Sequence, residues 1–221
     1  MADPERLATF ARLRGLHDAR CAHAAQRVDG GVLATGLGEL DDAVGGGLPF
    51  GALTEVVCPA PGCGGQLLLL KLLEAARRER RRVALVDGLD DFDPSSCPED
   101  LLRHVVWMRC AGVAQAMQTV DIVARDANFG LVVLDVKRAP LRELQRVPAT
   151  TWYRLQRALE RSEPVLLVET PRALVPSAQL RLSLPRRFAL ASLENERAAL
   201  NALLAPAVER QRMQRAAELA G

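Results

Sequence analysis

The stretch from residue 52 to residue 81 constrains the fold more than any other part of the chain. It reads ALTEVV, an apolar strand, then CPAPGCGG, a turn rich in glycine and proline, and then QLLLLKLLEAARRERR, a long helix. A strand that runs through a glycine turn directly into a helix is the start of a βαβ unit. In such a unit the next strand lies parallel to the first. The sequence therefore predicts an α/β domain.

Further strands and helices alternate along the chain after this unit. Helices are predicted at 113–127 and 151–162, and apolar strands at 82–88, 104–109, 131–136 and 164–170. Strands that are apolar throughout are buried on both faces, as in a sheet covered by helices on each side. We expect a mostly parallel sheet with right-handed crossovers, ending in an antiparallel pair formed by 179–184 and 188–192.

Both ends of the chain are predicted to be helical. Apolar residues recur at helical spacing between residues 4 and 26, and residues 194–219 have a helical composition, with a break or kink at Pro206. The predicted organisation is an N-terminal helical segment (1–30), a core (31–192) and a C-terminal helical tail (193–221).

Composition narrows the class of protein. The 221 residues suffice for one domain, and no apolar run approaches the roughly 20 residues of a membrane span. The charged N-terminus lacks the apolar centre of a secretion signal, so a cytoplasmic location is expected. The five cysteines are scattered without a C-x-x-C pair, and the histidines lack ligand spacing, which predicts free thiols and no metal site. Cys63 is either a small buried residue or a thiol whose pKa is lowered by the following helix.

The turn between strand and helix resembles a phosphate-binding loop, G-x-x-x-x-G-K-[ST], that lacks its lysine. If Gly64 is the second glycine, Gly65 stands at the lysine position and Gln66 at the hydroxyl position; a frame that starts at Cys58 moves the lysine position to Gly64. Lys71 lies about 9 Å further along the helix. The candidate residues of this degenerate loop are Cys58, Pro59, Gly62, Gly64, Gly65 and Gln66. The prolines remove amide donors, whereas the glycines at the helix N-terminus keep some capacity to bind an anion.

Three stretches resemble the RecA family. TGLGELDDAVGGGLPFGALTEVVCP (35–59) is similar to the family's approach to its phosphate loop, VALVDGLDDFDP (83–94) to the strand and loop that carry its catalytic glutamate, and LVVLD (131–135) to its Walker B strand. The resemblance implies a RecA-like core in which Asp135 is the Walker B aspartate. Leu89 occupies the glutamate position, with Asp90 and Asp91 beside it as displaced bases or as a solvated acidic loop.

Within this family the short length and the missing lysine are most similar to the ImuA group of damage-inducible mutagenesis cassettes. That resemblance implies a non-catalytic adaptor of the SOS response, acting in translesion DNA synthesis during DNA repair and mutagenesis. Its expected partners are an ImuB-type inactive Y-family polymerase, through it an error-prone replicative polymerase subunit and the sliding clamp, and also RecA.

Other readings stay open at this stage. No cofactor and no catalytic residue is expected of an adaptor, and contact with DNA would be weak or indirect at a nucleoid-associated location. One alternative is a DNA-stimulated RecA-type ATPase that uses ATP and magnesium. Another is a SulA-like inhibitor of cell division.

Overall fold

The fold is seen in a computed structural model that describes residues 31–212. A seven-stranded sheet forms its centre, with the strand order β5-β4-β6-β7-β3-β8-β9. Neighbouring strands are parallel except for β8 and β9, which are antiparallel. The strands are β3 (Leu53–Val57), β4 (Arg82–Asp87), β5 (Val105–Arg109), β6 (Phe129–Asp135), β7 (Val165–Thr170), β8 (Leu180–Ser183) and β9 (Ala207–Gln211). The predicted α/β fold with a RecA-like, mostly parallel sheet is confirmed.

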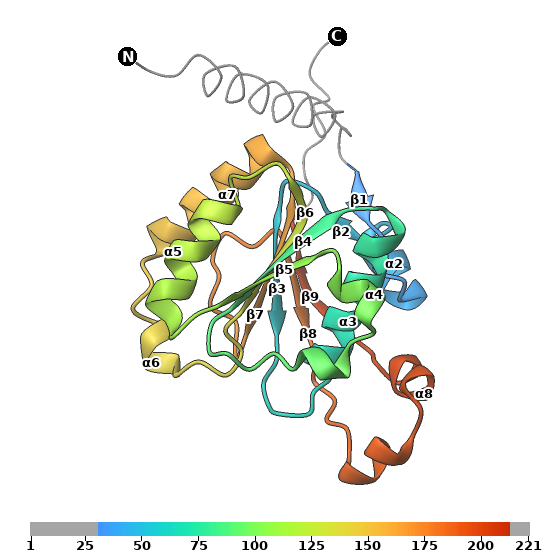
Figure 1. Cartoon of the computed structure of the whole chain (residues 1–221). Coiled ribbons are helices and arrows are strands. Elements are labelled where there is room, and N and C mark those ends of the chain that lie inside the picture. Colours follow the sequence, from blue (N-terminus) through green and yellow to red (C-terminus); the bar gives the residue numbers. More distant parts are fainter. Residues whose placement is uncertain (1–30, 213–221) are drawn as a thin grey trace, which may run out of the picture.

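Helices cover both faces of this sheet (Figure 1). One face carries α2 (Gly38–Val44), α3 (Gly65–Arg78) and α4 (Glu99–Leu102), and the other carries α5 (Val113–Val123), α6 (Leu141–Leu144) and α7 (Ala149–Ser162). This three-layer arrangement explains why β3, β6 and β7 are buried on both sides, because each side faces a layer of helices.

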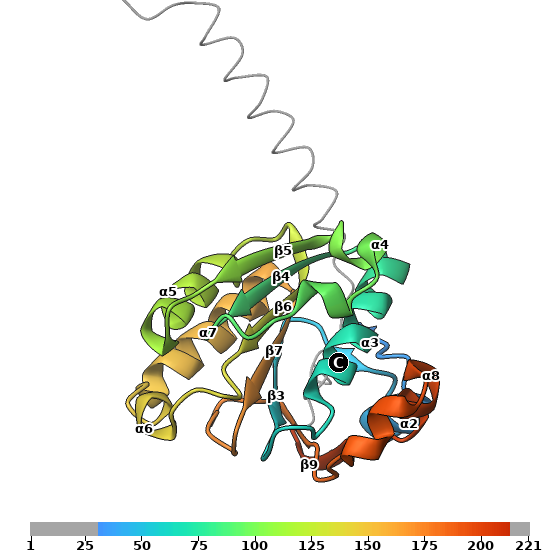
Figure 2. The ribbon, with the colours of Figure 1, turned by 60° about the horizontal axis from the view of Figure 1, so that its bottom comes forward.

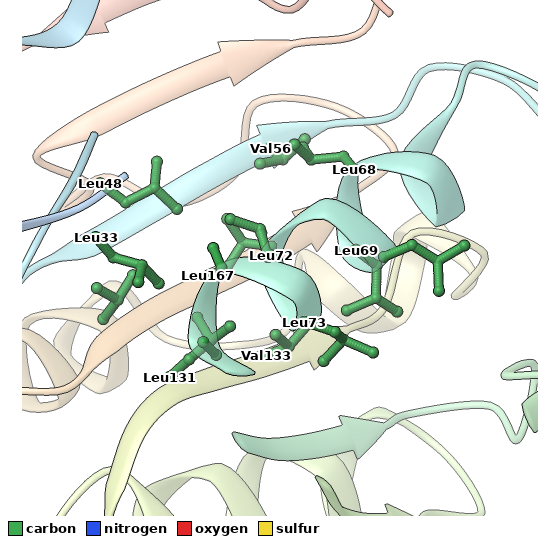
Figure 3. Close-up of a cluster of buried hydrophobic side chains, with 14 of the residues drawn as sticks. Leu33, Leu48, Val56, Leu68, Leu69, Leu72, Leu73, Leu131, Val133 and Leu167 are labelled. Carbon is green, nitrogen blue, oxygen red and sulfur yellow. The ribbon is translucent and has the colours of Figure 1, made fainter. Parts of the chain in front are cut away.

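The leucine run of α3 forms the centre of the larger core. Leu69, Leu72 and Leu73 point from α3 onto the sheet, where Val133 and Leu167 meet them (Figure 3). Leucine has a high helix propensity, and this 3–4 residue spacing places its side chains on one helix face. The helix ends where Arg77 and Arg78 place two cations in its last turn, which favours the helix dipole.

A second core fills the opposite face. Trp152, Leu155 and Leu159 of α7 and Val120 of α5 pack there against the other side of the same strands. Helix α7 stops at Glu163, which adopts the left-handed conformation directly before Pro164. A small two-stranded sheet, β1 (Val32–Leu33) and β2 (Leu48–Pro49), closes the edge of the first core.

The C-terminal region differs from its prediction. Residues 188–192 form no strand, and the predicted helix over 194–219 is limited, within the described residues, to α8 (Arg197–Ala202) after the short 3-10 helix η2 (Leu190–Glu194). Pro206 ends the helical region, and β9 then adds to the edge of the sheet beside β8. Arg210 fixes this strand by donating to the carbonyls of Pro176 and Ala178. The gain of ladder hydrogen bonds at an open edge explains why this segment is a strand.

The predicted N-terminal helix of residues 4–26 lies outside the described residues, as do residues 213–221. Among the helices of residues 31–212, none has the length and apolar character needed to cross a membrane.

Candidate functional site

The candidate site lies at the carboxyl ends of the parallel strands. The phosphate-like loop follows β3, Asp87 and Asp135 end β4 and β6, and Glu169 stands in β7. The strand register pairs Asp135 with Asp87 on one side and with Glu169 on the other. Since paired residues on neighbouring strands point to the same face, three carboxylates lie in a row beneath the start of α3.

The loop itself surrounds a cavity of about 700 Å³. Gly62 and Gly64 have φ of 75° and 97°, the left-handed region that glycine adopts without strain, and these turns lead the chain into α3. All the candidate residues of the loop line this cavity: Cys58, Pro59, Gly62, Gly64, Gly65 and Gln66. Gln66, at the hydroxyl position, has a buried Nε2 without a hydrogen-bond partner among the described residues.

A lysine does reach the loop, but it comes from another element. Lys137 follows β6, and its Cδ lies 3.4 Å from the point where a Cβ on Gly65 would stand. The side chain of Lys137 therefore passes the position at which the phosphate-loop motif has its own lysine. Its Nζ forms ion pairs with the carboxylates of Asp135 and Glu169, the latter at 2.5 Å.

Lys137 forms ion pairs with two carboxylates at once. Burial opposes the charged ammonium, but the carboxylates of Glu169 and Asp135 outweigh it and raise the pKa of Lys137. Burial raises the pKa of Glu169 to about 7, although Lys137 opposes the shift. We infer that Lys137 stays protonated and that its charge is balanced by the carboxylates beside it, so that little positive charge remains at the loop.

The amides of the loop are directed at a thiol. The hydrogen bond from Cys58 lowers the pKa of Cys63 to about 6, and the amides of Ala60 and Gly65 also donate to its sulfur. The pKa of Cys58 is raised by this same hydrogen bond and by burial. These contacts favour the thiolate form of Cys63 over the thiol. Cys63 is a small buried residue, one of the two interpretations of the sequence, and its pKa is lowered mainly by Cys58 and not by the following helix alone.

The C-terminal segment covers the loop from outside. The amide of Phe188 donates to the carbonyl of Gly62 at 2.9 Å, and the side chains of Phe188 and Leu204 press on Gly64. A Cβ at Gly64 would lie 2.6 Å from Leu204 Cδ1, so only glycine fits there. Figure 2 shows α8, which precedes Leu204, on the same side of the sheet as α2 and α3. We call residues 185–206 the cover segment.

The acidic loop after β4 has a structural role. Asp87 is fully buried and accepts hydrogen bonds from the amides of Asp91 and Phe92 and from the indole of Trp107. Asp90, one of the two displaced bases considered above, forms an exposed ion pair with Arg109 and does not line the cavity. Asp91 does line it, with its carboxylate 3.6 Å from Arg138.

A run of five arginines at and after the end of α3 lies away from this cavity: Arg77, Arg78, Arg80, Arg81 and Arg82. Arg81 stacks on the ring of Phe50, with its guanidinium carbon 4.1 Å from the ring centre, and Arg78 donates to the carbonyl of Ala34. These contacts join the helix end to the β1 and β2 region.

Two central residues of the site were missed by sequence reasoning. Glu169 lies inside the apolar strand PVLLVET, and Lys137 lies two residues after Asp135. A carboxylate within an otherwise apolar buried strand requires a partner, and this chain offers only Lys71 and Lys137 as lysines. The need of Glu169 for a cationic partner could therefore be read from the sequence. The strand order that brings Glu169 and Lys137 together could not.

No known protein-family model matches the chain. Among residues 31–212 there is also no group of three or more histidine, cysteine, aspartate or glutamate side chains arranged to hold a metal ion.

Proposed function

We propose that the protein is a non-catalytic adaptor on a RecA-like core, in which the nucleotide site has been converted into part of the core. The observation that carries the proposal is the position of Lys137: it reaches the phosphate-like loop, yet its charge is engaged by Asp135 and Glu169. Phosphoryl transfer depends on cations that neutralise charge on the phosphates, and this cation is already neutralised.

The loop and its surroundings support the same reading. The amides of Ala60 and Gly65 are directed at the Cys63 sulfur, whereas in a phosphate-binding loop such amides face the phosphate. The apolar side chains of Phe188 and Leu204 cover Gly64, where a phosphate-binding loop must stay open. A scaffold of this kind acts through binding to other proteins.

The pathway follows from the resemblance to the ImuA group. In this proposal the protein acts in translesion DNA synthesis after DNA damage and binds an ImuB-type inactive Y-family polymerase. Through this partner it joins an error-prone replicative polymerase subunit and the sliding clamp. Any contact with DNA or RecA is secondary to the protein complex.

Two measurements test separate parts of this proposal. Calorimetric titration of magnesium-ATP into the full-length protein, with and without single-stranded DNA, should give no binding heat and no hydrolysis. Micromolar binding with hydrolysis that is lost in Asp135→Asn but kept in Asp90→Asn would instead support a DNA-stimulated ATPase. Asp90 is the matched control because it is an exposed aspartate outside the cavity.

The adaptor role is tested by gel filtration of the purified protein mixed with a purified ImuB-type partner. Co-elution in a defined ratio is the expected result. Separate elution of two folded proteins would refute the partner while leaving the conclusion on catalysis unaffected.

A further inference from the structure

The phosphate-like loop also places two thiols in contact. Cys58 is the first residue after β3, and Cys63 lies five residues later. Their side chains hydrogen-bond to one another. Both side chains line the cavity of about 700 Å³ although each residue is at most 5% exposed. A small solute can therefore reach the pair through the cavity, whereas a protein surface cannot.

The loop between the two cysteines is held in one shape. Pro59 and Pro61 fix their own φ angles, Gly62 adopts a φ of 75°, and the Gly62 carbonyl accepts the amide of Phe188. The amide of Cys58 in turn donates to the carbonyl of Thr170 at 2.7 Å. A loop constrained at both ends loses little further entropy when its two ends are joined covalently.

We propose that Cys58 and Cys63 are an oxidant-sensitive dithiol that closes to an intramolecular disulfide when the protein meets hydrogen peroxide. In the first step the Cys63 thiolate attacks one peroxide oxygen, the O–O bond breaks, and the leaving hydroxide takes a proton from solvent to become water. Cys63 is then a sulfenic acid, oxidised by two electrons.

In the second step the sulfur of Cys58 attacks the sulfenic sulfur. The S–S bond forms, the S–O bond breaks, and the hydroxide leaves with the proton of the Cys58 thiol as a second water. The sum is two thiols and one peroxide giving one disulfide and two waters. Cys63 is the attacking residue because its sulfur accepts the amide hydrogens that stabilise a thiolate, while Cys58 is the buried resolving thiol.

Closure changes the electrostatics of the loop. A disulfide sulfur carries no charge, so the amides of Ala60 and Gly65 lose the anion that they hold in the reduced protein. The proposal does not depend on the adaptor function, since it concerns only the chemistry of the loop.

Mass spectrometry of the full-length protein tests the proposal directly. The protein is treated with a small excess of hydrogen peroxide, its free thiols are alkylated, and it is digested with trypsin. The peptide from Val28 to Lys71 contains Cys58 and Cys63 and no other cysteine. We expect this peptide to lose two hydrogens, to carry no alkyl group, and to recover two alkylation sites after dithiothreitol.

Variants separate the two steps. In Cys58→Ser the reaction should stop at the Cys63 sulfenic acid, which dimedone traps, and Cys97→Ser should behave like the wild type. Because the thiolate attacks and the pKa of Cys63 is about 6, the wild-type rate should rise about tenfold between pH 5 and pH 7. A 28–71 peptide that keeps two alkylated thiols while methionines are oxidised would overturn the proposal. A disulfide that links Cys63 to Cys97 or Cys110 would do the same.

Discussion

Lys137 is the residue on which the carboxylate cluster depends. Replacing it by methionine keeps most of the side-chain volume but leaves Asp135 and Glu169 without a cation. Removing one partner of a buried ion pair typically lowers the free energy of unfolding by about 3–5 kcal/mol. Because Lys137 is partly exposed, we expect a loss near the lower end of this range. Lys71→Met is the matched control, because the ion pair of Lys71 with Glu74 lies near the surface and should contribute about 1 kcal/mol or less.

The same variant should respond to pH in a defined direction. Burial already raises the pKa of Glu169 to about 7 in the presence of Lys137, and the loss of the ammonium raises it further. Between the ordinary carboxyl pKa and this raised value, the folded state holds a proton that the unfolded state has released. The destabilisation of Lys137→Met should therefore shrink as the pH falls from 8 to 5, as measured by urea unfolding. A cost that grows toward low pH would contradict the ion-pair assignment.

Single residues differ in how far the sequence predicts their roles. The absence of a lysine at Gly65 can be read directly from the motif, and Asp135 does lie at the end of β6 as the motif requires. The structure adds why Gly65 is glycine: Cys58 Sγ and Lys137 Cδ lie within 3.4 Å of where its Cβ would stand. Contacts between residues 65 and 137 depend on strand order, which no local pattern contains.

At the scale of the elements, two adjacent leucines test whether the cover segment stabilises the phosphate-like loop. Leu204 is buried against Gly64, whereas its neighbour Leu203 is 39% exposed. Leu204→Ala should loosen the cover and cost about 2–3 kcal/mol, because it leaves a cavity above the loop. Leu203→Ala should change the stability by less than about 1 kcal/mol.

Hydrogen exchange distinguishes local loosening from global destabilisation. In Leu204→Ala the amides of residues 60–68 should exchange faster than in Leu203→Ala. The amides of β6 and β7 should slow or speed only as much as the change in the free energy of global unfolding requires. Unchanged exchange in the loop would show that the cover segment does not protect it.

Elements were predictable where burial makes their sequences uniform. β3, β4, β6 and β7 are apolar runs between turn residues, and the structure places each of them within two residues of its prediction. β9 has the sequence AVERQ, which is largely exposed and has neither strand alternation nor an apolar run. It is a strand because β8 offers an open edge, so its state is decided by tertiary pairing and not by local propensity.

At the scale of the whole molecule, one sheet divides two cores that should unfold together. Leu72 of α3 and Leu155 of α7 are both fully buried but lie on opposite faces of the sheet. Each change to alanine should cost about 2–5 kcal/mol and lower the temperature of a single unfolding transition. Ile122→Ala, at a side chain that is 71% exposed, is the control and should have little effect. Two separate transitions in calorimetry would contradict a single cooperative unit.

The position of β3 has a consequence for how the chain is made. β3 is synthesised first among the strands of the large sheet, yet its neighbours β7 and β8 come near the end, where Leu53 pairs with Leu166 and Thr54 with Leu180. During translation, the phosphate-like loop and the leucine face of α3 therefore leave the ribosome long before the strands that flank them. Pairings of such long range form slowly, and an exposed apolar face invites aggregation in the interval. The nascent chain should accordingly need shielding, by a ribosome-bound chaperone for example, until residues beyond β8 have emerged.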